Sequence, residues 1–181
     1  MSAADRYTGD EHRSHHPAWH REDSAWKATQ ITHMLDCFGL RPETVLDVGC
    51  GRGGVLAALA PRLPMATRML GCDPSPHAIG MGHSGRDPRV ELVQGSPPEG
   101  ERFDLTLCID VLEHVEDYIG FLRDLRGRAE HTLLHIPLDT SAQSVLRAAP
   151  LLDLRRPSGH PHSFTRDTAL ATPETAGSAV L

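Results

Sequence analysis

The residues with the clearest chemistry follow a short apolar run. Residues 44–48 are β-prone and carry one acidic residue, Asp47, and glycines then occupy positions 49, 51 and 53. This pattern predicts a buried strand that ends in a glycine turn, followed by a helix over 54–62. Glycine lets a ligand approach the backbone closely, and a helix N-terminus offers N–H groups to electron-rich atoms. The segment therefore predicts a strand, turn and helix that bind a nucleotide or nucleoside.

A second acidic residue stands at the end of the next predicted strand. Asp73 lies twenty positions after Gly53, where a carboxylate can accept hydrogen bonds from both hydroxyls of a ribose. The glycines also fit the dinucleotide pattern G-x-G-x-x-G, which alone is weak evidence. Asp47 separates the two interpretations, because a carboxylate two residues before the first glycine suits a ligand with a cationic amino group. More than forty residues also precede this strand, whereas dinucleotide domains often begin with it.

A parallel sheet is needed to bring these residues to one edge. Strand signals recur at 44–48, 67–72, 90–94, 103–109 and 131–136, with helical patterns at 54–62, 75–82 and 117–128. The alternation predicts an α/β fold, doubly wound and mainly parallel, with helices on both faces of the sheet. Residues 95–102 are few for a parallel crossover and predict a compact loop.

One more helix is expected before the first strand. It should begin at Asp23 or Ser24 and end at Gly39. Its apolar stripe is expected to consist of residues that step by four and are widened by two neighbours: Trp26, Gln30, Met34 and Phe38, with Ile31 and Leu35.

Composition excludes several classes of protein. The 181 residues carry a formal charge of −6 without a block of Lys or Arg, which argues against a dedicated nucleic-acid binder. The four cysteines, at 37, 50, 72 and 108, lack metal-type spacing and are predicted to be reduced core residues. No apolar stretch reaches membrane-spanning length and the N-terminus is polar, so a cytoplasmic protein is expected. Residues 1–18 are expected to form a flexible tail and 19–181 one domain.

Four segments together resemble the class I S-adenosylmethionine-dependent methyltransferases, a Rossmann-like family. They are 45–53 (VLDVGCGRG), 70–75 (LGCDPS), 103–115 (FDLTLCIDVLEHV) and 159–165 (GHPHSFT). The resemblance covers roughly residues 20–181 and implies S-adenosylmethionine as cofactor and a small molecule as methyl acceptor. Two alternatives stay open. One is a shortened, weakly active homologue that binds the cofactor and serves as an interaction subunit; the other is a dinucleotide-dependent oxidoreductase, disfavoured because the chain has no Tyr-x-x-x-Lys pair.

The resemblance also implies which residues contact the cofactor. Asp47 with the backbone of the first two glycines should hold the methionine end, and Asp73 the ribose. The loop after the third strand should lie on the adenine side. The complete predicted set is Asp47, Gly49, Cys50, Gly51, Gly53, Asp73, Pro74, Gly95, Ser96, Asp110 and Val111.

Catalytic residues are predicted where the fourth strand ends. Asp110 is expected to contact the amino group of the cofactor or the substrate. His114 is the candidate general base, because an unperturbed imidazole titrates near neutrality, although a packing role is an equal alternative. Some relatives hold a divalent ion with a similar carboxylate–x–x–Glu–His group and a later histidine; here the string is Asp110-x-x-Glu113-His114, with His160 and His162 downstream. The main prediction is that no metal binds, because Mg²⁺ prefers oxygen donors to imidazole.

The C-terminal region departs from the family pattern. Residues 139–164 have no strand character and are the predicted substrate cover, with a short helix over 141–149. The family usually ends with two further strands, whereas here, after a helix around 166–175, residues 178–181 can only begin the first of them. The fifth strand would then be an apolar edge. Either a homodimer covers it, or residues 178–181 fold back beside it after the helix.

Overall fold

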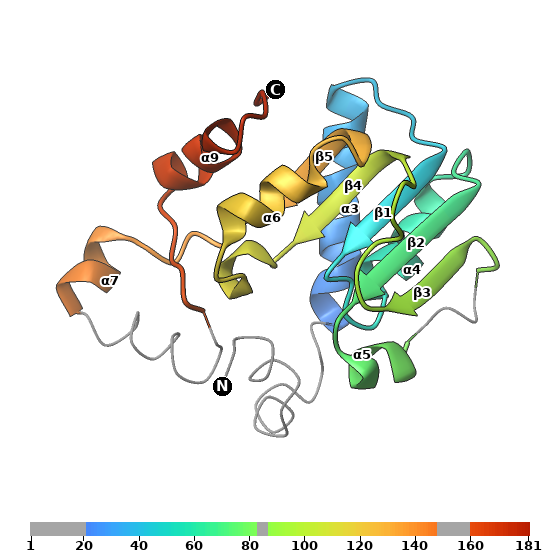
Figure 1. The fold of residues 1–181 in the computed structure, drawn as a ribbon, viewed down its shortest axis with the longest axis horizontal. Helices are drawn as coiled ribbons and strands as arrows, with labels where there is room; N and C mark the ends of the chain where they lie inside the picture. The colour runs from blue at the N-terminus through green and yellow to red at the C-terminus, as the bar shows by residue number, and fades with distance from the viewer. Residues whose placement is uncertain (1–20, 83–86, 148–159) are drawn as a thin grey trace. The chain divides into compact units, whose positions relative to one another are not determined.

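The computed structural model describes residues 21–82, 87–147 and 160–181 and contains a five-stranded sheet. Its strand order is β3-β2-β1-β4-β5 (Figure 1). The strands are β1 (Thr44–Val48), β2 (Arg68–Asp73), β3 (Val90–Gln94), β4 (Phe103–Ile109) and β5 (Ala129–His135). β1 pairs in parallel with β2 and with β4, and β2 pairs in parallel with β3. The predicted α/β, Rossmann-like fold class is confirmed.

Helices alternate with the strands as the sequence predicts. They are α3 (Arg21–Cys37), α4 (Gly54–Leu59) with the 3₁₀ turn η1 (Ala60–Arg62), α5 (Pro76–Gly80), the 3₁₀ turn η3 (Leu112–His114), α6 (Tyr118–Leu125), α7 (Ala142–Arg147) and α9 (Arg166–Thr175). Residues 95–102 contain no helix, so the compact loop predicted there is confirmed. The expected tail at 1–18 lies outside the described residues, and so do parts of the expected substrate cover.

The described residues fall into two compact units. The sheet unit runs from α3 to Ile109 and includes Arg128–Leu134, so it holds β1 to β4 and nearly all of β5. The helical unit holds Asp110–Gly127 and the described residues from His135 onward, with η3, α6, α7 and α9. Among the described helices, none is both long and apolar enough to span a bilayer.

The core of the sheet unit joins α3 and α4 to the sheet. Ala28, Ile31 and Leu35 are the buried positions of α3. The predicted stripe is confirmed at Ile31 and Leu35. It was wrong for the series that steps by four, because the large side chains of that series are exposed: Trp26 by 56%, Met34 by 45% and Phe38 by 46%. Gln30 is exposed as well, so the whole series that steps by four lies outside the buried face. The remaining core residues are Val45, Leu56, Leu59, Ala60, Leu63, Ala66, Met69, Val90, Leu105, Leu107 and Ile109.

Two further expectations were wrong. Cys37 is exposed, while the other three cysteines are buried and all four are free thiols. Residues 178–181 form no strand. Ser178 N–H instead donates to the carbonyl of Pro173 at 2.9 Å, which ties this segment to the end of α9. In the sheet of the described residues β5 therefore has one neighbour, β4, and the homodimer expected at this edge stays a prediction.

The helical unit is held together by contacts between segments distant in sequence. Arg126 Nη1 donates to the carbonyl of Ala176 at 3.1 Å, where α6 packs on α9. Thr140 N–H donates to the carbonyl of Phe164 at 3.1 Å, so the segment after β5 pairs with the segment before α9. Phe164 is buried and packs edge-on against the ring of Tyr118, with 5.5 Å between centroids.

Candidate functional site

The glycines in the turn after β1 have positive φ values, which residues with a side chain rarely adopt. Gly49, Gly51 and Gly53 have φ values of 76°, 55° and 74°. A Cβ on Gly53 would lie 2.8 Å from Cδ2 of Leu92, so a larger residue there would displace the Leu92 side chain. The N–H groups of Gly49 and Cys50 both donate to the carbonyl of Cys72, at 2.8 and 3.1 Å. The turn is therefore tied to the end of β2.

Asp73 holds this turn in place through a hydrogen bond to its backbone. Its side chain is fully buried, and its Oδ2 accepts the Gly51 N–H at 2.9 Å while Oδ1 accepts the Ser75 N–H at 2.8 Å. Burial raises the pKa of Asp73, and these two backbone hydrogen bonds act against that rise. The sequence analysis predicted a ribose ligand at Asp73 but missed its bond to the turn. Each carboxylate oxygen has a second acceptor site, so both roles are compatible.

Asp47 is the second buried carboxylate at this end of the sheet. Its side chain is 2% exposed, and burial raises its pKa to about 7, with a further rise from the nearby charge of Asp73. Lys27 of α3 acts in the opposite direction and lowers it. A carboxylate in such surroundings gains most from a cationic partner, because the partner offsets the cost of burying the charge.

The other cofactor contacts predicted in the sheet unit lie in the loops that follow β1, β2 and β3. Gly95 N–H donates to the carbonyl of Asp73 at 2.9 Å, which places the loop after β3 beside the end of β2. Gly95, Ser96 and Pro74 are exposed, whereas Cys50 is buried. Burial raises the pKa of the Cys50 thiol, so this residue contributes packing and its backbone N–H to the turn, not a reactive thiolate.

Asp110 opens the helical unit in an unusual conformation. It follows β4 directly and is the one non-glycine residue with positive φ, 55°, in the described chain. Its N–H donates to the carbonyl of His135 at 3.0 Å, and its Oδ1 accepts from His135 Nδ1 at 2.5 Å. The strained backbone is thus held by a double contact to the end of β5. Val111, the last predicted cofactor contact, is the half-buried residue that precedes η3.

Sequence reasoning missed His135. Its partner lies 25 positions earlier, so no local motif joins the two residues. The available signal was its position at the end of a strand, which in parallel α/β sheets is the edge where ligands bind.

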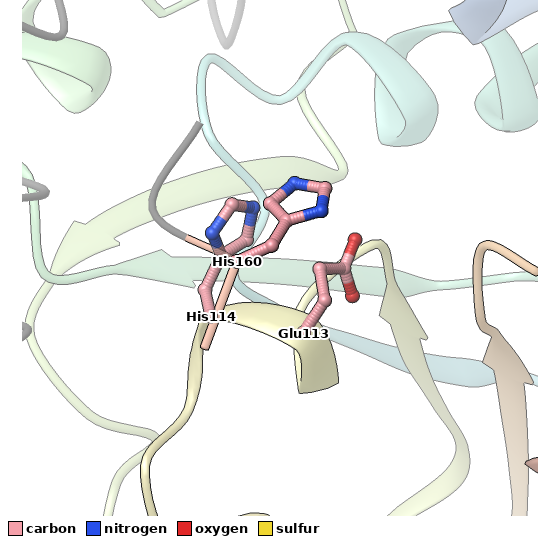
Figure 2. A group of neighbouring side chains, drawn as sticks. All are labelled: Glu113, His114 and His160. Atoms are coloured by element: carbon pink, nitrogen blue, oxygen red, sulfur yellow. The ribbon is translucent and has the colours of Figure 1, made fainter. Parts of the chain in front are cut away.

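Glu113, His114 and His160 form a cluster in the helical unit (Figure 2). Glu113 is buried, and one potential ligand atom from each residue lies within 4.8 Å of the others. The rings of His114 and His160 meet edge to face with centroids 4.7 Å apart. The cluster joins η3 to a residue 46 positions later, as the alternative metal prediction required. Asp110 is not a member of it, because its carboxylate is turned to His135.

The segment that carries His160 is attached to η3 and α6 at several points. His162 Nε2 donates to the carbonyl of Glu116 at 3.0 Å, and its ring stacks edge-on against Tyr118 with centroids 4.7 Å apart. His160 Nδ1 lies 3.3 Å from Oδ2 of Asp139. Asp139 was not singled out from the sequence, because a lone acidic residue in a loop gives no signal of its partner.

Comparison with known proteins identifies a family. Residues 18–178 match the family described as methyltransferase domain. The ubiquinone biosynthesis O-methyltransferase of Azorhizobium caulinodans is 44% identical over 98 residues, which are 49% of this chain and 38% of that protein. The mitochondrial ubiquinone biosynthesis O-methyltransferase of Schizosaccharomyces pombe is 32% identical over 143 residues, 68% of this chain and 51% of that protein. The chain thus spans about half, or less, of the length of these curated relatives.

Solved structures agree on the fold. The plantazolicin methyltransferase BpumL in complex with SAH aligns with a TM-score of 0.64 and 18% identity, covering 96% of this chain and 71% of that one. The small RNA methyltransferase HEN1 aligns with a TM-score of 0.67 and 18% identity, covering 84% of this chain and 21% of that one. At such identities the likeness concerns the fold alone.

The raised pKa of Asp47 predicts that S-adenosylmethionine binds more weakly in acid. The sequence predicts that Asp47 pairs with the cationic amino group of this ligand when its carboxylate is ionised. With a pKa of about 7, Asp47 is half ionised at pH 7 but mostly protonated at pH 6. Affinity measured by calorimetry should therefore fall about fivefold from pH 7 to pH 6. Asp47→Asn should bind weakly at both values and lose this dependence. An affinity that is constant over this range in the unmodified protein would contradict the prediction.

Proposed function

Because the chain belongs to the class I S-adenosylmethionine-dependent methyltransferase family, we propose that it transfers the methyl group of S-adenosylmethionine to a hydroxyl oxygen of a small molecule. The observation that carries the cofactor assignment is the pair of buried carboxylates, Asp47 and Asp73, beside a glycine turn with positive φ. The curated relatives named as O-methyltransferases of ubiquinone biosynthesis support oxygen as the acceptor atom.

Different residues of the sheet unit contact different parts of the cofactor. Asp47 accepts hydrogen bonds from the cationic amino group, and the turn from Gly49 to Gly53 admits the methionine portion against the backbone. Asp73 accepts from the ribose hydroxyls with the lone pairs that Gly51 and Ser75 leave available. Gly95 and Ser96 flank the adenine from the loop after β3. A dinucleotide has no cationic amino group for Asp47, which is why the proposal favours the sulfonium cofactor.

The reaction asks the protein mainly for alignment. A lone pair of the acceptor oxygen forms a bond to the methyl carbon while the carbon–sulfur bond breaks, and its electron pair returns to sulfur, which becomes a neutral thioether. The hydroxyl proton must leave the oxygen. His114 is proposed to accept it, as an imidazole suits proton transfer near neutral pH. Holding nucleophile, methyl and sulfur in line supplies most of the remaining rate acceleration.

Glu113, His114 and His160 fit a divalent cation. Glu113 is buried and one potential ligand atom from each residue lies within 4.8 Å of the others, so these three side chains would hold the ion. One carboxylate and two imidazoles suit zinc, manganese or iron better than magnesium. A bound ion would act as a Lewis acid toward the acceptor oxygen. This role and a free general base at His114 exclude each other, because both use a lone pair of the same ring.

The assignment of Asp73 to the ribose is tested by substitution against a matched control. Asp73→Ala removes charge-assisted hydrogen bonds, so it should weaken S-adenosylmethionine binding by about 1.5–3 kcal/mol in calorimetry. Asp104 is the control, because it also accepts two backbone N–H bonds, from Glu43 and Thr44, but at the amino ends of β1 and β4. Asp104→Ala should leave the affinity within about twofold. Equal losses in both variants would show a general loss of stability and would remove Asp73 from the binding site.

The role of His114 is tested by turnover on a panel of small phenols and catechols, with formation of S-adenosylhomocysteine as the readout. His114→Ala should lower the rate by about 10²–10⁴-fold. His33→Ala changes an exposed histidine on α3 and should leave the rate unchanged. Loss of turnover on adding a chelator, restored by zinc or manganese, assigns His114 to the metal. Full activity of His114→Ala would leave it a packing residue. Cofactor binding without turnover of any acceptor favours the non-catalytic interaction subunit.

A further inference from the structure

Asp139 and His160 form a partly buried pair in the helical unit. Oδ2 of Asp139 lies 3.3 Å from Nδ1 of His160, and their side chains are 17% and 15% exposed. A carboxylate oxygen can only accept a hydrogen bond, so Nδ1 of His160 carries the proton in this contact. In the neutral ring the lone pair is then on Nε2. The pair thus leaves one defined nitrogen of His160 for a metal ion.

Asp139 is placed to support a ligand without being one. Among the described residues, the cluster of potential ligand atoms consists of Glu113, His114 and His160 and does not include Asp139. A carboxylate on the outer nitrogen of a ligating imidazole fixes its tautomer and ring orientation and strengthens it as a donor. His160 needs such support more than His114 does, because it comes from a loop segment, whereas His114 belongs to η3.

The backbone around His160 has attachments that do not depend on Asp139. The Thr140 N–H to Phe164 carbonyl bond, the His162 to Glu116 bond and the packing of Phe164 on Tyr118 all persist when the Asp139 side chain is removed. Truncation of Asp139 should therefore release the ring of His160 without releasing its segment. This separation lets a positioning role be distinguished from a purely structural one.

We propose that Asp139 is a positioning residue that holds His160 in the Nδ1–H tautomer and so presents Nε2 to a divalent transition-metal ion shared with Glu113 and His114. This inference rests on the proposed function in the form in which His114 binds the metal and does not act as a free general base. The donor set of one carboxylate and two imidazoles predicts that Zn²⁺ and Mn²⁺ bind more tightly than Mg²⁺.

The test is a calorimetric titration of the whole chain with Zn²⁺, in which Glu113→Gln defines the signal of this site and subtracts binding to other histidines. Asp139→Ala should lower the Zn²⁺ affinity by about 10–100-fold. Asp139→Asn keeps an acceptor but loses the charge, so its loss should be smaller. Asp117→Ala is the matched control, because Asp117 in the same unit caps α6 through the Gly120 N–H and should leave the Zn²⁺ affinity within about twofold. Long-range ¹H–¹⁵N spectra of the metal-free protein should show His160 as the Nδ1–H tautomer.

An unchanged affinity in Asp139→Ala, an equal loss in Asp117→Ala or a His160 ring in the Nε2–H tautomer would each overturn the positioning role. Absence of a Zn²⁺ signal that depends on Glu113 would overturn it as well. A parallel titration with S-adenosylmethionine separates these failures from that of the proposed function. If the cofactor binds and the metal does not, only the metal inference fails. If the metal binds and the cofactor does not, the methyltransferase proposal fails.

Discussion

Two carboxylates buried on adjacent strands set the demands that the rest of the site must meet. Asp47 on β1 and Asp73 at the end of β2 are 2% and 0% exposed, and each raises the pKa of a carboxylate or thiol near it. Burial of like charges is unfavourable unless hydrogen bonds or a cation offset it. Asp73 obtains its hydrogen bonds from the backbone of Gly51 and Ser75. The Gly51 N–H comes from a turn in which Gly49, Gly51 and Gly53 have positive φ, so the glycines and the carboxylate hold this end of the sheet together.

Asp47 has a different balance. Its folded pKa of about 7 lies above the ordinary value, so ionising it opposes folding as the pH rises through 7. Lys27 offsets only part of this cost. A ligand with a cationic amino group would offset the rest of the cost of ionising the buried Asp47 carboxylate. The site is therefore destabilised in the free protein in the way that favours its cofactor.

In the helical unit, imidazoles take the place of backbone amides as the hydrogen-bond donors to carboxylates. His135 and His160 each have Nδ1 beside a carboxylate, of Asp110 and Asp139 respectively. Each pairing fixes a ring and defines which nitrogen points elsewhere. The difference between the pairs is informative, because the positive φ of Asp110 turns its carboxylate to His135 and away from the cluster, although it belongs to the same sequence string as Glu113 and His114. The string alone would have assigned all three residues to one site.

Local chemistry explains which predictions succeeded. The strands, the glycine turn and the positions of Asp47 and Asp73 follow from short patterns of apolar residues and glycines, and these were predictable. The buried face of α3 was predicted only at Ile31 and Leu35, because Trp26 and Phe38 mimic an apolar stripe although they are exposed. Residues 178–181 were expected to begin a strand but are tied to α9 through Pro173. The pairing of His135 with Asp110 and of His160 with Asp139 arises from tertiary folding, which one sequence without its relatives does not reveal.

Calorimetric titration of the unmodified chain with S-adenosylmethionine, and separately with NAD⁺ and NADP⁺, tests the central claim most directly. The claim is that the buried carboxylate of Asp47 and the glycine turn form a site for a ligand with a cationic amino group and a ribose. The account predicts saturable binding of S-adenosylmethionine with one site per chain and no binding of either dinucleotide. Binding of a nicotinamide dinucleotide in the absence of S-adenosylmethionine binding would contradict it.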